Sequence, residues 1–298
     1  MKGDISLYKG ELDLAENEYR RLAGREEPAA QILALNRLFW LAELQGKFAA
    51  AGAQSSAWWE KANKLGQQAW IWSVRFNTAH YELQIGHPEM ALTKFQELSD
   101  QASEQEDINS QRWELHGKGL AYSAMNRSAE ALRVAGELRK ITEGGLNKKS
   151  VWLYFHLMGS IELKQRNFVL AIENLEKALP LMPFESDIWS AGLQALFFDS
   201  LAQSYLEAGQ QEKALATYNK ITQLTSGRLA WGVIYAKSFY QLGKINEMRG
   251  DRAKAIDHYR KFLDLWKNAD PNLPEVEDAK KRLAGLTASG VSPKIEKK

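Results

Sequence analysis

Apolar residues recur along this chain in a helical rhythm that restarts about every 40 residues. Each cycle opens with a small or turn-forming residue, and an alanine follows five positions later. The pairs are Gly10 and Ala15, Gly46 and Ala51, Gly86 and Ala91, Asn126 and Ala131, Arg166 and Ala171, Gly209 and Ala214, and Gly250 and Ala255. Successive alanines are 36, 40, 40, 40, 43 and 41 residues apart. Such a constant interval indicates a tandem repeat.

Each repeat is predicted to be a pair of antiparallel helices. Gly and Asn readily close a helix in the left-handed conformation, so the first residue of each pair should join the two helices. Arg166 is the exception in residue type. The alanine lets the helices approach closely, and large side chains follow four residues later at Tyr19, Phe95, Leu175, Tyr218 and Tyr259. Three residues further on come Leu22, Leu98, Ala178, Ile221 and Phe262, which completes one buried helical stripe.

The two ends of the chain differ. The pattern predicts a final amphipathic helix over about 274–286, with its apolar stripe at Val276, Ala279, Leu283 and Leu286. A helix with a polar outer face can cover the last repeat of a solenoid. Residues 287–298 are predicted to be a disordered tail. Residues 1–9 match the latter half of a first helix, so we expect the chain to be the C-terminal part of a longer protein.

Composition narrows the possible functions. The chain has 298 residues and no cysteine, which excludes disulfides, thiolate zinc sites and cysteine nucleophiles. Lys plus Arg exceeds Asp plus Glu by 39 − 37 = 2, so charge gives no argument for a nucleic-acid partner. No apolar run approaches the roughly 20 residues that span a bilayer, so membrane insertion is not expected. The cytoplasm is the favoured location, although a membrane-anchored parent protein would also allow the periplasm.

The repeat resembles the tetratricopeptide pattern Gly-x-Phe-x-x-Ala-x-x-x-Leu-x-x-Ala, in which proline ends the second helix. Residues 167–183 carry it most clearly, with Phe168, Ala171, Ala178 and Pro183 on the family positions. The resemblance covers about residues 1–286. It implies an all-α, right-handed α-solenoid of about seven helix-turn-helix repeats with a C-terminal capping helix. The period is longer than the usual 34 residues of the family. The C-terminal end is similar to repeat regions attached to bacterial serine/threonine kinases or winged-helix regulators.

The resemblance implies a scaffold that binds a peptide or a partner helix in its concave groove. The residues expected to line this groove are a mixture of aromatic and polar side chains, suited to anchoring and orienting a peptide. They are Asn36, Trp40, Phe76, His80, Trp113, His116, His156, Gln203, Tyr240 and Lys244. The alternative is a sensor domain of a larger signalling protein, in which a small ligand or peptide changes the curvature of the array and controls a fused effector. The oligomeric state is left open.

Three histidines recur at related positions of neighbouring repeats. His116 and His156 are 40 residues apart, and His80 lies one helical turn further along its own helix. A metal or proton-transfer site would need three or four converging ligands. Ordinary hydrogen bonding in a groove is the favoured interpretation. No cofactor or metal is therefore predicted.

No catalytic residue is predicted, and the chain is expected not to be an enzyme. Gly144 and Gly145 lack the spaced glycines and the lysine of a phosphate-binding loop. Chaperone-docking members of the family clamp a carboxylate with lysines and asparagines at first-helix positions five, nine and thirteen. In this chain those positions hold Asn36, Trp40 and Leu44, then His156, Ser160 and Lys164, and then Asp199, Gln203 and Glu207. No pair of repeats supplies the clamp, so chaperone-tail binding is not expected.

Overall fold

The computed structural model describes residues 2–104, 108–145, 147–182, 188–225 and 227–288. These residues form an all-α solenoid of helix-turn-helix repeats, as predicted, and they contain no β-strand. The paired helices are α1 Lys2–Lys9 and α2 Leu12–Ala23, α3 Pro28–Leu44 and α4 Phe48–Leu65, α5 Gln68–Gln84 and α6 Pro88–Glu104, α7 Ile108–Ala124 and α8 Ser128–Gly144, α9 Trp152–Lys164 and α10 Phe168–Ala178, α11 Ile188–Glu207 and α12 Gln211–Gln223, and α14 Gly232–Met248 and α15 Arg252–Leu265. Short helical segments lie at Lys148–Val151, Leu179–Leu181 and α13 Gly227–Ala230, and α16 Pro274–Ala288 follows the last pair.

The turn inside each pair has the backbone conformation that the sequence predicts. The seven turn residues that connect the paired helices all have positive φ: Gly10, Gly46, Gly86, Asn126, Arg166, Gly209 and Gly250. Arg166 adopts φ +66° although it carries a side chain, a conformation that costs an L-residue roughly 1–2 kcal/mol. The repeat geometry therefore overrides the local preference of the arginine.

The alanine five positions after each of these turn residues lies where the paired helices approach each other closely. Ala15, Ala51, Ala91, Ala131, Ala171, Ala214 and Ala255 are all fully buried. The large residues that follow them are buried as well, including Tyr19, Phe95 and Tyr259. These positions form the predicted stripe, which fills the space between each pair and the next.

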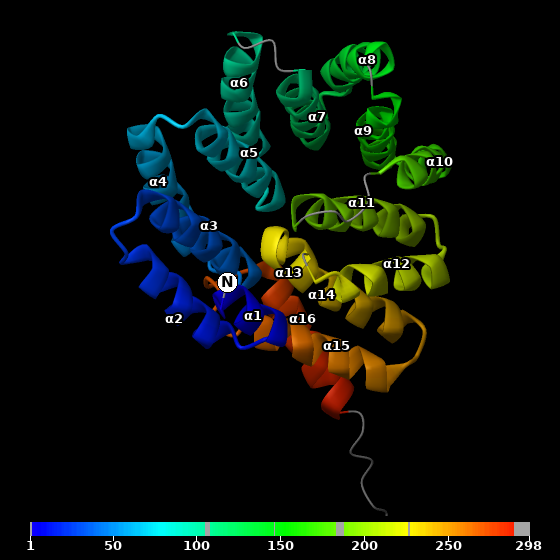
Figure 1. The fold of residues 1–298 in the computed structure, drawn as a ribbon. Helices are drawn as coiled ribbons and strands as arrows, with labels where there is room; N and C mark the ends of the chain where they lie inside the picture. The colour runs from blue at the N-terminus through cyan, green and yellow to red at the C-terminus, as the bar shows by residue number, and fades with distance from the viewer. Residues whose placement is uncertain (1, 105–107, 146, 183–187, 226, 289–298) are drawn as a thin grey trace, which may run out of the picture.

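The two ends of the array meet, so the solenoid closes into a ring (Figure 1). The blue helices α1 and α3 lie beside the yellow and orange helices α13 and α14. At this joint the backbone N–H of Asp270 donates to the carbonyl of Gly46 at 3.0 Å, and a carboxylate oxygen of Asp270 accepts from the backbone N–H of Ala49 at 2.8 Å. Phe48 meets the Trp266 ring edge-on at 5.6 Å. One hydrophobic core is shared by residues from both ends of the chain.

Glycine is required at the joint. A Cβ atom on Gly46 would lie 2.8 Å from the Trp266 ring and 2.9 Å from the Ala269 methyl group. A Cβ atom on Gly232 would lie 2.6 Å from the Leu44 backbone. Both ends of the array are therefore in backbone-level contact, with no room for a side chain between them.

The capping helix α16 packs on the last repeat. Its own residues Val276 and Ala279 are buried, and Lys237 on α14 pairs with Glu275 of α16 at 2.6 Å. The helix ends two residues beyond the predicted limit of 286, because Thr287 and Ala288 are helical. The rest of the predicted disordered tail, residues 289–298, lies outside the described part of the chain. None of the described helices is long and apolar enough to cross a membrane.

Candidate functional site

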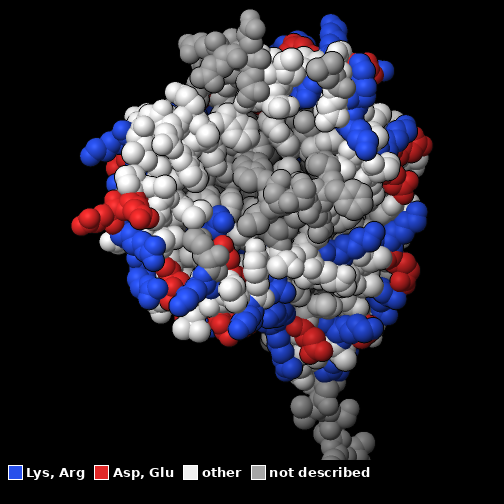
Figure 2. All heavy atoms as spheres, viewed as in Figure 1, with Lys and Arg blue, Asp and Glu red and all other residues white. Residues whose placement is uncertain are grey.

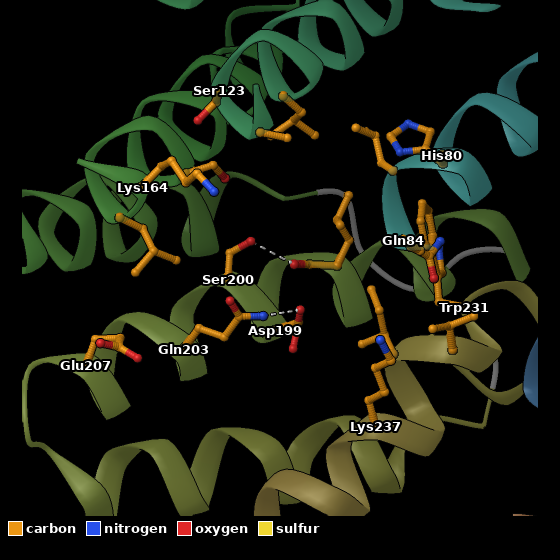
Figure 3. A pocket seen from close by; sticks show the side chains of 18 of the residues that line it. His80, Gln84, Ser123, Lys164, Asp199, Ser200, Gln203, Glu207, Trp231 and Lys237 are labelled. Atoms are coloured by element: carbon orange, nitrogen blue, oxygen red, sulfur yellow. Dashed lines mark hydrogen bonds between the residues drawn. The ribbon is translucent and has the colours of Figure 1, made fainter. Parts of the chain in front are cut away.

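The ring encloses a cavity of about 610 Å³, which falls within the size range of small-molecule binding sites. Its wall is built from the inner faces of first helices, together with the α9–α10 turn and the segment that joins α13 to α14. The residues that line the cavity include His80, Gln84, Asp199, Ser200, Gln203, Trp231, Lys237 and Gln241. Figure 3 shows these side chains, apart from Gln241, pointing toward a common space.

Helix α11 contributes a row of polar side chains along the middle of the cavity (Figure 3). Asp199 and Gln203 lie one helical turn apart, and the Gln203 amide donates to the Asp199 carboxylate at 2.7 Å. Burial raises the pKa of Asp199 to about 7, although the nearby Lys237 and the Gln203 hydrogen bond both lower it. The Asp199 side chain is part-exposed to the cavity, yet it is surrounded by protein rather than bulk water. It therefore changes charge close to neutral pH.

A chain of hydrogen bonds runs from the cavity into the protein. The Ser200 hydroxyl lies 3.1 Å from Nε2 of His156, and Nδ1 of His156 lies 2.8 Å from Nε2 of His116. Both imidazoles are fully buried. Burial lowers the pKa of His116 to about 3 and places that of His156 well below its usual value. Both histidines are therefore neutral, and each can donate from one nitrogen and accept at the other.

The order serine, histidine, histidine resembles a nucleophile, a base and an orienting group. Ser200, however, lies in the interior of α11, where the neighbouring backbone N–H groups belong to the helix. They are not free to stabilise an oxyanion. A strongly lowered pKa also makes His156 a weak base. The arrangement suits a buried polar network that fixes Ser200 rather than one that activates it.

His80 forms the wall of the cavity on the α5 side. It is 2% exposed, and its ring meets Trp231 edge-on at 5.2 Å. Burial, and to a smaller degree the proximity of His116, keeps the pKa of His80 well below its ordinary value. Among the described residues, Nε2 of His80 has no hydrogen-bond partner. Because α5 and α13–α14 lie on opposite sides of the joint, this contact spans both ends of the array.

Charge on the outer surface gives no sign of a nucleic-acid interface on the face seen in Figure 2. Basic and acidic side chains alternate around its periphery, and neither sign forms a continuous patch. Within the described part of the chain, no three His, Asp or Glu residues are grouped so that they could hold a metal ion.

Comparisons with known proteins agree with this architecture. The sequence profile of the tetratricopeptide repeat matches residues 200–224 and 237–269. These two stretches of the chain are therefore similar to the tetratricopeptide repeat. Among curated proteins, a heat shock protein sti1 homolog from Schizosaccharomyces pombe is 30% identical over 124 residues. That match covers 42% of this chain and 19% of the relative, so the chain matches about a fifth of that relative's length.

Two solved structures share the fold. One is a signal transduction ATPase with numerous domains that carries a tetratricopeptide repeat sensor, from Pyrococcus horikoshii, with 17% identity and a TM-score of 0.52. The match covers 94% of this chain and 43% of the other chain. The other is the APC/C hetero-tetramer Cut9-Hcn1, with 16% identity, a TM-score of 0.50, and coverage of 93% and 46%. At these identities the likeness concerns the fold.

Two of the ten predicted groove residues, His80 and Gln203, line the cavity. His116 and His156 lie behind the wall and reach the cavity through Ser200. Trp113 is half-buried between other rings and lies 5.4 Å from Phe76, edge-on. His116, His156 and Trp113 are therefore packed against protein.

The remaining predicted residues lie away from the cavity. Phe76 is 1% exposed and stacks on Trp72 at 4.9 Å. Asn36 and Trp40 on α3 are buried, and the Trp40 indole donates to Asn77 at 3.3 Å. Tyr240 donates to Asp278 of the capping helix at 2.7 Å, and Lys244 lies over the Tyr240 ring. Contacts with neighbouring helices cover Phe76 and Trp40, and the capping helix α16 contacts Tyr240. A binding role for these side chains stays a prediction.

Several cavity residues were not among the predicted groove residues. Asp199 stands at a first-helix position where chaperone-docking relatives place clamp residues, and that register was the available signal. Trp231 and Lys237 enter the cavity through the joint, which brings α13 and α14 next to α5. No pattern within a single repeat predicts a contact between residues more than 150 positions apart.

Proposed function

We propose that this chain is a non-catalytic interaction scaffold that holds a short segment of a partner in its central cavity. The observation that carries the proposal is the closed ring, which leaves a cavity of about 610 Å³ in place of an open groove. A short extended peptide fits such a cavity, because side chains of α5, α7, α9, α11 and α14 line it and offer hydrogen-bonding groups.

The proposal can be tested by selecting binders from a library of displayed random heptapeptides. Ala124→Trp would place a large side chain in the cavity, since Ala124 lines it and is exposed. Ala129→Trp on α8 is the matched control, because Ala129 is also exposed but does not line the cavity. The selected peptides should bind Ala124→Trp at least about tenfold more weakly and Ala129→Trp unchanged. Equal binding to both variants would contradict the proposal.

A sensor role is the second candidate, and the contact between His80 and Trp231 favours it. This contact crosses the joint at 5.2 Å and forms part of the cavity wall, so a bound ligand would touch both ends of the array. Binding would then stabilise closure. Hydrogen exchange of the Asp270 and Ala49 amides, which bond across the joint, should slow when a selected peptide binds. Unchanged exchange at saturation would argue against the sensor role.

A further inference from the structure

On one side of the cavity the Asp199 carboxylate is a hydrogen-bond acceptor that is only partly satisfied. Asp199 receives a hydrogen bond from Gln203, but among the described residues no Lys, Arg or His forms an ion pair with its carboxylate. Buried charges in proteins are normally paired. The Asp199 carboxylate therefore faces the cavity with acceptor capacity to spare.

The nearest cation does not satisfy this carboxylate. The Lys237 ammonium group pairs with Glu275 of α16 at 2.6 Å and lies 6.0 Å from the centre of the Trp266 ring. Its charge is therefore already balanced on the α16 side. Lys237 affects Asp199 through space, in the direction of a lower pKa, without replacing a direct donor.

Three further polar atoms lie close to the same space. The side-chain oxygens of Gln84 and Gln241 and Nε2 of His80 are buried without a hydrogen-bond partner among the described residues. Because these three atoms are not exposed to the cavity, the Asp199 carboxylate is the acceptor that a ligand would meet directly. Trp231 adds an aromatic ring beside His80, and aromatic faces attract cations.

We infer that this side of the cavity binds a positively charged amine or guanidinium group, with the Asp199 carboxylate as its counter-ion. The inference rests on the proposed function, since it names the chemistry of the segment that the cavity holds. Figure 3 separates this region, around His80 and Trp231, from the part of the cavity lined by Lys164 and Glu207. The cationic group of the ligand therefore enters toward Trp231.

The group can belong to a peptide side chain, to a peptide N-terminus or to a free amine, and calorimetric titration separates these sources. The probes are the capped peptide Ac-Ala-Lys-Ala-amide, the uncapped peptide Ala-Ala-Ala-amide and cadaverine. Ac-Ala-norleucine-Ala-amide is the uncharged control. We expect at least one of the charged probes to bind at least about tenfold more tightly than the norleucine peptide, and the tightest probe identifies the source. Equal affinity for all four probes would overturn the inference.

Asp199→Asn tests the counter-ion directly, because it removes the charge and preserves the size of the side chain. Binding of the preferred charged probe should weaken about tenfold or more, consistent with loss of a charge-assisted hydrogen bond. Asp257→Asn on α15 removes an equal charge from an exposed position away from the cavity and should leave binding unchanged. Unchanged binding in Asp199→Asn, with wild-type thermal stability, would overturn the inference.

The two variants distinguish failure of the proposed function from failure of the amine assignment. If Ala124→Trp abolishes peptide binding but Asp199→Asn does not, the cavity is the site and the amine assignment is wrong. If Ala124→Trp has no effect, the proposed function itself is wrong. A pH series adds a readout specific to Asp199, since its carboxyl is mostly protonated at pH 6 and mostly ionised at pH 8. The charged probe should bind about tenfold more tightly at pH 8, and Asn at position 199 should remove this dependence.

Discussion

The joint between the ends of the array and the wall of the central cavity differ in how closely they are packed and in how far their buried polar groups are hydrogen-bonded. At the joint, Gly46 and Trp266 pack without space, and the backbone N–H and one carboxylate oxygen of Asp270 form hydrogen bonds across it. At the cavity wall, by contrast, the Asp199 carboxylate forms a hydrogen bond with Gln203 but no ion pair with a described residue. The first region fixes the shape of the molecule, and the second offers a site. Repeat proteins are usually stabilised by contacts between neighbours, whereas here a contact between distant repeats creates the cavity.

The largest effect is expected at the joint. Gly46→Ala should destabilise the protein by about 3 kcal/mol, because the new methyl group meets the Trp266 ring and the backbone has positive φ. Gly86→Ala is the matched control, since Gly86 also has positive φ but has no neighbouring atom within 4 Å. It should cost about 1–2 kcal/mol. Chemical denaturation of both variants measures the difference, and equal losses would show that Trp266 does not press on Gly46.

The polar groups behind and along the cavity wall should shift stability with pH in opposite directions. His116 is neutral when folded, with a pKa of about 3, but binds a proton below about pH 6.5 when unfolded. Its contribution to stability is therefore present above pH 6.5 and is lost as the pH falls. Between pH 7 and pH 5, His116 therefore lowers the free energy of unfolding by about 2 kcal/mol. Asp199 has a raised pKa of about 7, so over the same interval it raises the free energy of unfolding by about 2 kcal/mol.

Single substitutions separate these opposing contributions. His116→Gln should make the protein lose less stability between pH 7 and 5 than the wild type, and Asp199→Asn should make it lose more. Denaturant titrations at pH 7, 6 and 5 give both differences. Changes of the same sign in the two variants would contradict the burial assigned to one of these groups.

The smallest effect is expected at the atypical turn. Arg166→Gly should stabilise the protein by about 1 kcal/mol, because glycine adopts φ +66° without strain. The stacking of Arg166 on Phe168 at 5.6 Å offsets a part of this gain. The reverse change at an equivalent turn, Gly209→Arg, should destabilise by a similar amount. A loss of thermal stability in Arg166→Gly would mean that the arginine contributes more than its backbone strain costs.

Local features of the fold were predictable from sequence. The identities of the turn residues and of the alanines that follow them are set by contacts within one helix pair. The same residue types therefore recur in each repeat and are visible in the sequence. Gln203 and His80 were assigned to the inner face for the same reason, and both line the cavity. Asp199 occupies a position in that register as well, but without a clamp partner it was not assigned to the groove.

Closure of the ring was not predictable from the repeat pattern. It depends on Trp266 packing on Phe48 and on Asp270 bonding to Gly46, contacts between residues more than 200 positions apart. Small rotations between successive repeats accumulate along a solenoid, and the pattern of a single repeat does not fix their sum. Trp40, Phe76 and Tyr240 were expected on an open groove, but contacts with neighbouring helices and with α16 bury them.

The closed ring is the central claim, and a distance across the joint tests it most directly. The chain has no cysteine, so Ala50→Cys with Asn268→Cys introduces two unique labelling sites, both exposed and adjacent to the joint residues. Pulsed electron paramagnetic resonance on the spin-labelled protein in solution should give one narrow, short distance distribution. A long or broad distribution would show that the ends of the array are apart, and the cavity as described would not exist.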